Sequence, residues 1–380
     1  MRADLDEVLA CLLQGTAVDD AAVAAIDVDR LARRADYHGI VPLLAHRLRR
    51  SSSAACALGD VLKEPARRML AADLVREPEI HAVLAALMQA GIVPLVMKGC
   101  QLAYSCYERS DLRPRLDTDL LIPAIARERA SAVLAGLGYE AAGQVDGDLL
   151  HYQATYIKWR DGLKQHIVDI HWRVANPQVF AGLMSYDELM HDAVDIPGLG
   201  PGVKGLSSPA ALLLACVHRV AHHFDSNRLI WLYDIHLLAT RMTAHEWDTF
   251  LDLAQDRKVA AVCAHSLDLT GCALATAIPA TVRNDQRLQA AAAWEASAAF
   301  LGSGRRQVDV VADDFQALTT WRDRMQLIRQ HLFPSRQYMR EVYALSPRTP
   351  LPLLYATRVV RGARRWFERS PINDDASGLR

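Results

Sequence analysis

Two aspartates spaced two residues apart, Asp117 and Asp119, lead directly into a short apolar run at residues 120–122. In an extended strand, side chains two residues apart point to the same face, so the two carboxylates project together. Carboxylates held side by side at the end of a buried strand repel each other and require a cation. Mg²⁺ suits such a pair, because it takes carboxylate oxygens and keeps coordination positions for phosphate. The pattern therefore predicts a strand that carries a divalent-metal site.

A third carboxylate, Asp169, falls in a predicted β-hairpin. Alternating apolar residues predict its two arms at residues 152–159 and 165–172, and the glycine-containing stretch 160–162 predicts the turn between them. Asp169 and His171 fall on the same face of the second arm. A strand is a rigid element, so it holds a site residue in a defined position.

The whole chain is expected to adopt an α+β fold, with a small mixed β-sheet core flanked by helical N-terminal and C-terminal parts. Apolar residues recurring at three and four positions predict helices over residues 1–90. The apolar run at 92–97 predicts a buried strand, and the glycine-rich residues 198–202 predict a linker. The expected domains are thus 1–90, 91–205 and 206–380.

Composition narrows the classes of function. The 380 residues are 51% hydrophobic and carry a net charge of −1, so a globular chain without a general attraction for nucleic acid is expected, and nucleic acid is not an expected partner. No apolar run approaches the roughly 20 residues that span a bilayer. The N-terminus is acidic, without the features of a signal peptide, and the seven cysteines are scattered singly. These features predict reduced thiols and a cytoplasmic location.

The ordered set of polar residues resembles the uncharacterised nucleotidyltransferase family of bacterial proteins, part of the polymerase-β-like nucleotidyltransferase superfamily. The resemblance spans roughly residues 35–270, and its ordered combination is more specific than Asp-x-Asp alone. Its residues are, in chain order, Lys98, Gly99, Arg113, Asp117, Asp119, Leu120, Leu121, Asp169, Ile170, His171, Trp172, His218, Arg228, Leu229, Trp231 and Asp234.

The resemblance implies transfer of a nucleoside monophosphate from an NTP, with ATP expected, to a hydroxyl-type acceptor on a small molecule, peptide or protein. It assigns residues 91–205 as the nucleotidyltransferase core. Two Mg²⁺ ions are implied as cofactors. Asp117 and Asp119 would bridge both ions, and Asp169 would complete the one that activates the acceptor hydroxyl.

The resemblance also implies a set of phosphate contacts. Gly99 would open a helix whose backbone N–H groups approach the phosphates, and Lys98 and Arg113 would add positive charge. The superfamily usually has serine after the glycine, whereas this chain has Cys100. A thiol is a weak donor, so the backbone donors carry more of this contact.

Four further residues are candidate contacts to the acceptor or the nucleotide: His171, His218, Arg228 and Asp234. His171 also suits a packing or hydrogen-bonding role. His218 and His222 share a helical face at a spacing that can hold zinc, or they line a domain interface as satisfied histidines.

Simpler explanations exist for the charged residues. Asp117 and Asp119 would also suit the solvent-facing end of a strand. Lys98 and Arg113 would suit structural ion pairs, and Asp169 would suit a structural partner of Arg113 or Arg115. A basic C-terminal stretch at 358–369 has an apolar stripe and is expected to dock on the body of the protein. The alternative is that it contacts a partner, an anionic membrane surface or RNA.

Two other functions fit the same residues. One is a non-catalytic nucleotide-binding or regulatory protein that retains the acids as an ion site. The other is a toxin–antitoxin-like enzyme that modifies a partner protein.

Overall fold

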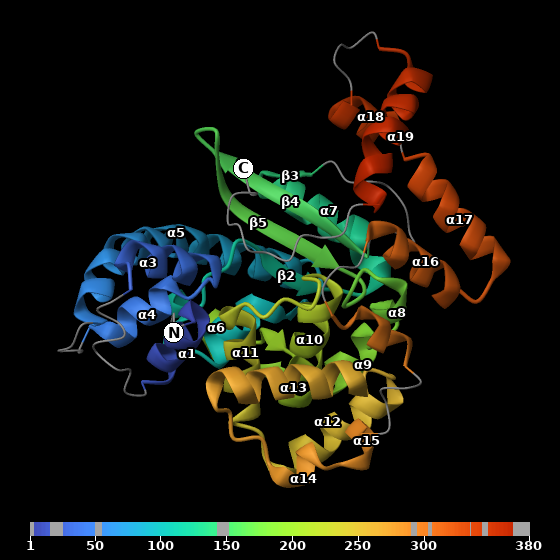
Figure 1. The fold of residues 1–380 in the computed structure, drawn as a ribbon. Helices are drawn as coiled ribbons and strands as arrows, with labels where there is room; N and C mark the ends of the chain where they lie inside the picture. Colours follow the sequence, from blue (N-terminus) through green and yellow to red (C-terminus); the bar gives the residue numbers. More distant parts are fainter. Residues whose placement is uncertain are drawn as a thin grey trace.

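A seven-stranded mixed sheet lies within a largely helical chain (Figure 1). The structure, a computed structural model, describes residues 4–15, 26–49, 55–142, 152–289, 295–302, 306–334, 336–343 and 349–367. Helices precede and follow the sheet along the sequence and cover both of its faces. The predicted α+β class, with helical N-terminal and C-terminal parts, is confirmed.

The strand order is β3-β4-β5-β2-β1-β7-β6. The strands are β1 (Leu95–Val96), β2 (Thr118–Leu121), β3 (Tyr139–Ala141), β4 (Gln153–Arg160), β5 (Leu163–His171), β6 (Val194–Asp195) and β7 (Lys204–Gly205). Strand β2 pairs antiparallel with β1 and parallel with β5. The strand predicted to carry the metal site therefore lies in the middle of the sheet, where neighbours on both sides fix its register.

The predicted hairpin is present as β4 and β5, which pair antiparallel along their lengths. Its turn consists of Asp161 and Gly162, with φ values of 52° and 76°. Two consecutive residues with positive φ are the requirement of the two-residue turn that matches the twist of a hairpin. Aspartate and glycine tolerate this conformation at low cost.

Helices make up most of the remaining chain. Before the sheet come α1 (Leu5–Gln14), α3 (Val28–Tyr37), α4 (Val41–Leu48) and α5 (Ala55–Gln89). Within the sheet region lie α6 (Lys98–Ser105), α7 (Arg127–Gly136), α8 (Gln178–Ala181) and α9 (Tyr186–His191), with 3₁₀ turns at Ser110–Leu112, Ala124–Ala126 and Pro197–Leu199. After it come α10 (Ser208–Ala221), α11 (Leu229–Ala239), α12 (Ala244–Asp256), α13 (Ala260–Leu274), α14 (Ala280–Arg283), α15 (Gln286–Gln289), a 3₁₀ turn at Ala296–Phe300, α16 (Gln307–Ala317), α17 (Trp321–Leu332), α18 (Arg336–Tyr343) and α19 (Leu351–Phe367).

Several helix starts follow from capping residues. Asp27 accepts hydrogen bonds from the first backbone N–H groups of α3. At α12, Thr243 and Glu246 form a capping box in which each side chain bonds the other's backbone. The helices predicted before residue 90 are confirmed over the part of this region that the structure describes.

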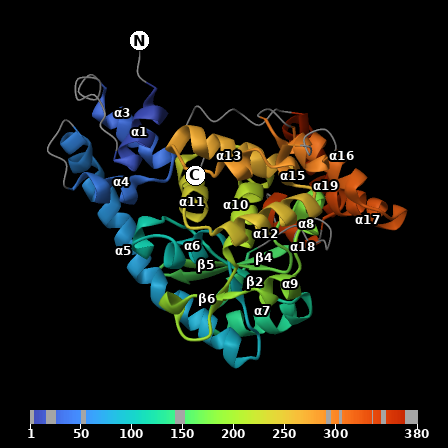
Figure 2. The same ribbon diagram turned by 90° about the horizontal axis from the view of Figure 1, so that it is seen from below.

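Side chains of the central strands alternate between the two faces of the sheet and so belong to two separate apolar clusters. Leu95 and Leu121 belong to the large apolar cluster that contains the N-terminal and C-terminal helices. Their neighbours Val96 and Leu120, with Ile170 of β5, belong to a second cluster with α5 and α7. The sheet thus separates α7 and the C-terminal half of α5 from α10–α13 (Figure 2). The face of β2 and β5 that carries the aspartates is the one turned toward the large cluster.

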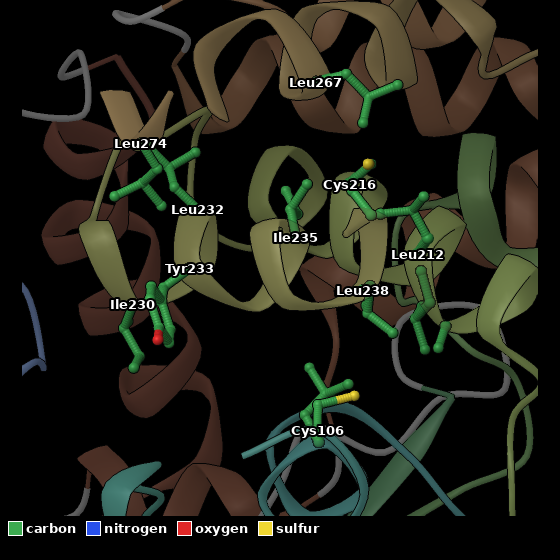
Figure 3. Packing of buried hydrophobic residues seen from close by; sticks show 14 of the residues in the cluster. Cys106, Leu212, Cys216, Ile230, Leu232, Tyr233, Ile235, Leu238, Leu267 and Leu274 are labelled. Atoms are coloured by element: carbon green, nitrogen blue, oxygen red, sulfur yellow. The ribbon is translucent and has the colours of Figure 1, made fainter. Parts of the chain in front are cut away.

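Helices that precede the sheet and helices that follow it share one apolar core. Leu9 of α1 and Leu44 of α4 lie in the same buried cluster as the residues of α10, α11 and α13. Within it, Leu267 of α13 faces Cys216 of α10 (Figure 3). Helices α16–α19 gather at one side of the molecule, coloured red in Figure 1. Among the described residues, no helix is long and apolar enough to cross a membrane.

The predicted linker needs correction. Residues 194–195 and 204–205, on either side of the glycine-rich stretch, are strands β6 and β7, and β7 pairs parallel with β1. A Cβ on Gly205 would lie 2.5 Å from Ile196 Cδ1, so a larger residue there would require the Ile196 side chain to shift. Two-residue strands have no periodicity to detect. Part of the basic stretch predicted at 358–369 lies in α19, and its side chains beyond residue 360 are outside the described part of the chain.

Candidate active site

Parallel pairing of β2 and β5 brings two carboxylates together. Asp119 and Asp169 are register partners on these adjacent strands, and both are buried. Asp117 lies just before β2, and all three aspartates line one cavity of about 710 Å³. The acids predicted from two separate strands therefore meet on one wall of a cavity.

Asp119 is held by two donors at the same oxygen. Lys98 Nζ lies 2.7 Å from Asp119 Oδ1, and His171 Nε2 lies 2.8 Å from the same atom. Burial would raise the pKa of Asp119, but the Lys98 ammonium and His171 outweigh it and lower that pKa. Burial and Lys98 lower the pKa of His171, so its neutral imidazole donates from Nε2. Asp119 is thus ionised and fixed in orientation.

Asp169 and Asp117 have a different environment. Thr155 Oγ1 donates to Asp169 Oδ1 at 2.6 Å and Gln153 Nε2 to Oδ2 at 3.2 Å, both from β4. Burial, with a contribution from Asp119, raises the pKa of Asp169. Burial and the carboxylates of Asp119 and Asp169 raise the pKa of Asp117 to about 7. The cluster holds more negative charge than its single lysine balances.

Lys98 reaches Asp119 through an unusual backbone conformation. Its φ is 54°, in the left-handed region that costs a non-glycine residue energy, of the order of 1 kcal/mol or more. This residue joins β1 to α6, so the strained turn directs the ammonium back over the sheet. Gly99 follows it, and a Cβ there would lie 3.4 Å from the guanidinium carbon of Arg113. The Lys-Gly pair thus lies at a tightly packed corner of the cavity.

Arg113 is engaged in an ion pair. Its Nη2 lies 2.7 Å from Asp234 Oδ2, and its Nε donates to both oxygens of that carboxylate. Tyr107 donates its hydroxyl to Asp234 at 2.7 Å. The structural ion pair considered for Arg113 is therefore present, with Asp234 rather than Asp169 as its partner. Both residues also line the cavity.

Cys100 lies away from the cavity lining. It is buried in the apolar cluster that includes Val96 and Leu120. Burial raises the pKa of its thiol to about 12, so the thiol is neutral. Its side chain packs against the core of the sheet, and its backbone lies in the first turn of α6.

The opposite wall of the cavity comes from the C-terminal helices. His218, His222 and His223 line it from the end of α10, with Arg228 and Trp231 at the start of α11. His223 stacks on Trp231 with ring centroids 3.8 Å apart, and Arg228 lies over the same indole. Burial and the charge of Lys98 lower the pKa of His218 and of His222. This wall therefore presents neutral histidines and an aromatic surface.

A zinc site at these histidines has no support in the geometry. In the part of the chain that the structure describes, the group whose ligand atoms all lie within 4.8 Å of one another is Asp119, Asp169 and His171. His218 Nε2 instead lies 3.1 Å from His223 Nε2, which is a hydrogen-bond distance.

Some cavity residues had no signal in the sequence. Asp73 and Arg76 line the cavity from α5, together with Arg115. Helix α5 precedes the motifs that carry the resemblance, so no spacing rule links it to them. Only the packing of α5 against the sheet places these charges beside Asp117.

A mixed sheet that sets paired carboxylates in the wall of a cavity is an architecture suited to enzymes that transfer phosphorus-containing groups. A family model described as an uncharacterised nucleotidyltransferase matches residues 24–275, about two thirds of the chain. The chain belongs to this family and is a nucleotidyltransferase, with a nucleotide as substrate. A search of the curated proteins finds no match.

The family implies a divalent metal, and the residues present fit one. The donors are carboxylate oxygens, the ligand type that hard cations prefer. Among the described residues, Oδ2 of Asp119 has no hydrogen-bond partner, because Lys98 and His171 both occupy Oδ1. Burial and the carboxylates of Asp119 and Asp169 raise the pKa of Asp117, and a bound cation would oppose that shift.

Asp117→Asn is expected to stabilise the metal-free protein at pH 8 by about 1–3 kcal/mol. The folded-state pKa of Asp117 is about 7, above its ordinary value of 3.8. The folded state therefore binds the Asp117 proton more tightly than the unfolded state does. The contribution of this proton to the free energy of unfolding is lost as the pH rises from about 4 to about 7. Urea unfolding in EDTA at pH 5 and pH 8 measures the effect.

Asparagine has no such titration, so its advantage should shrink at pH 5. Mg²⁺ should stabilise the wild type more than the variant, since binding there relieves a charge that the variant lacks. If the variant and the wild type have the same free energy of unfolding at both pH values, the neighbouring carboxylates do not disfavour the ionised form of Asp117.

Proposed function

We propose that this enzyme transfers a nucleoside monophosphate from an NTP, with ATP as the expected substrate, to a hydroxyl on a small molecule, peptide or protein, in the presence of Mg²⁺. The observation that carries the proposal is the register pairing of Asp119 with Asp169 on adjacent parallel strands, in a cavity that Asp117 also lines. Three acids on one wall of a cavity, with cationic residues close by, suit a substrate that arrives as a metal–phosphate complex.

Asp117, Asp119 and Asp169 would hold two Mg²⁺ ions. When bound, the ions supply charge neutralisation at the attacking and leaving oxygens of an in-line displacement. His171 donates to Asp119 and so keeps one of these carboxylates oriented.

In the proposed reaction, the acceptor oxygen forms a bond to the α-phosphorus while the bond between that phosphorus and the bridging oxygen breaks. Pyrophosphate leaves. Asp169 takes the proton of the acceptor hydroxyl. Thr155 and Gln153 hold the carboxylate in place for this role.

Phosphate binding would involve the start of α6. Backbone N–H groups at Gly99 and Cys100 belong to the first turn of this helix, where donors are unpaired and a phosphate is favoured. Cys100 would contribute through its backbone, since its thiol is buried. Lys98 would contact phosphate when a metal ion takes over the charge of Asp119, and Arg113 lies beside Gly99.

The helical wall would bind the acceptor or the nucleoside. His218 and Arg228 lie on it, and Asp234 acts by holding Arg113. In this proposal the unit 91–205 supplies the metal side of the cavity and the helical unit 206–380 supplies most of the acceptor side, while the N-terminal helical unit is 1–90.

Incubation with each of four α-labelled NTPs and Mg²⁺ tests the proposal. We expect pyrophosphate release and transfer of label to an acceptor from cell extract or to the chain itself. Binding of NTP without transfer, unchanged by Asp119→Asn, would indicate a non-catalytic nucleotide-binding protein instead. Label found only on one copurifying protein would indicate an enzyme that modifies a partner.

A further inference from the structure

Two arginines share one aspartate on the α5 side of the cavity. Arg115 Nη2 lies 2.9 Å from Asp73 Oδ1, and Arg76 Nη1 lies 3.2 Å from the same oxygen. All three residues line the cavity that contains Asp117. The side chains of Arg115 and Arg76 are only 2% and 13% exposed, so solvent screens their charges weakly.

The positive charge of this corner comes from Arg76 and Arg115, and the carboxylate within hydrogen-bond distance of both is Asp73. Two guanidinium groups face one carboxylate, and the nearby Asp111 is already paired with Arg109 at 2.9 Å. Burial and the charge of Arg115 lower the pKa of Arg76, which is the expected response to an incompletely compensated cation. The corner is therefore attractive to an anion.

The two arginines differ in how many donors they have used. Arg115 also donates to the carbonyl oxygen of Ser110 at 3.0 Å and to the Tyr104 hydroxyl at 3.3 Å. Arg76 makes one hydrogen bond to the described residues, from Nη1 to Asp73, and its buried Nε has no partner. A guanidinium has five N–H donors. Arg76 thus keeps donors for a ligand, while Arg115 is fixed by the protein.

Two other cations of the cavity, Lys98 and Arg113, are already paired with carboxylates. Lys98 contacts Asp119 at 2.7 Å, and Arg113 contacts Asp234 at 2.7 Å. A triphosphate carries several negative charges, and its terminal groups need donors beyond those of the metal ions. Arg76 is close enough to Asp117 for the two charges to interact, so it lies beside the proposed metal site.

We infer that Arg76, held in place by Asp73 and Arg115, binds the terminal phosphates of the NTP and the pyrophosphate that leaves. The inference rests on the proposed function for the identity of the ligand. Arginine suits this role, because its planar fork bonds two phosphate oxygens at once.

Equilibrium binding of ATP, pyrophosphate and tripolyphosphate, each with Mg²⁺, tests the inference. Arg76→Gln is expected to weaken all three by about 10- to 100-fold, since charged hydrogen bonds to phosphate are lost. Arg76→Lys should keep part of the affinity, because lysine keeps the positive charge but lacks the planar pair of N–H donors. Adenosine, which has no phosphate, should bind all variants with equal affinity.

Arg67→Gln is the matched control, because Arg67 lies on the same helix with a side chain 66% exposed. It should bind the three ligands as the wild type does. Equal affinity of Arg76→Gln and wild type for ATP and pyrophosphate would overturn the inference and leave the proposed function intact. Tripolyphosphate binding that depends on Arg76 in a protein without transfer activity would sustain the inference while the proposed function fails.

Discussion

Replacing Asp119 with asparagine is expected to lower the rate of nucleotidyl transfer by about 10³-fold or more. Lys98 and His171 both contact the carboxylate of Asp119, and Asp169 is the register partner of Asp119 on β5. Asparagine retains an oxygen for the two hydrogen bonds, so the local packing should persist. What it removes is the negative charge that the metal ions and the phosphates require. Initial rates with saturating Mg²⁺ and NTP measure the loss.

The control for this substitution is Asp195→Asn. Asp195 lies on β6 of the same sheet, is mostly exposed, and pairs with Lys204 at 2.9 Å. Exposed ion pairs contribute little, so activity and stability should match those of the wild type. If Asp119→Asn folds normally and keeps more than about a tenth of the activity, Asp119 is not part of the reaction centre.

Arg219→Met is expected to lower the free energy of unfolding by about 3–5 kcal/mol. Arg219 is completely buried in α10 and lies 2.6 Å from the buried carboxylate of Asp225. Among the described residues, removing the guanidinium leaves that charge with His265 and the backbone N–H of Gly302 as its partners. Urea unfolding at pH 7 measures the change.

The same ion pair shapes the histidine wall of the cavity. Phe224 and Asp225 follow His223 directly and both have positive φ, 51° and 58°, which is unfavourable for non-glycine residues. Arg219 holds this turn closed from within the helix that carries the histidines. The variant should therefore also disturb the wall formed by His222 and His223.

Two further variants make this result interpretable. Arg287→Met removes a surface arginine that pairs with three aspartates, and it should cost no more than about 1 kcal/mol. Combining Arg219→Met with Asp225→Asn should recover part of the lost stability, because asparagine is neutral and tolerates positive φ. If the Arg219 and Arg287 variants lose the same free energy of unfolding, the buried ion pair does not stabilise the turn.

Local patterns were informative where the structure depends on near neighbours. The hairpin at 153–171 followed from alternation and a glycine-containing turn, and both aspects are confirmed. The helical N-terminal part followed from periodicity. Strands β6 and β7 have no such local signal, because each is two residues long. Strand β7 pairs with β1, about 110 residues earlier in the chain, and β6 pairs with β7.

The ion partners show the same division. Arg113 was expected at phosphate, and its residue type agrees with that role, yet its observed partner is Asp234 of α11. No sequence motif in α5 indicates a role for Arg76. A charged side chain reveals what it can bind, but its partner depends on which distant element packs beside it.

The sequence by itself determined the α+β class, the family, and the order of the acids along two strands. It could do so because face alternation and residue chemistry are local properties. Only the tertiary structure decided that Asp119 pairs in register with Asp169, that Lys98 turns back onto Asp119, and that α5 and α10 both line the cavity. Those relations depend on long-range packing of apolar faces, which many sequences satisfy equally well and which no short pattern encodes.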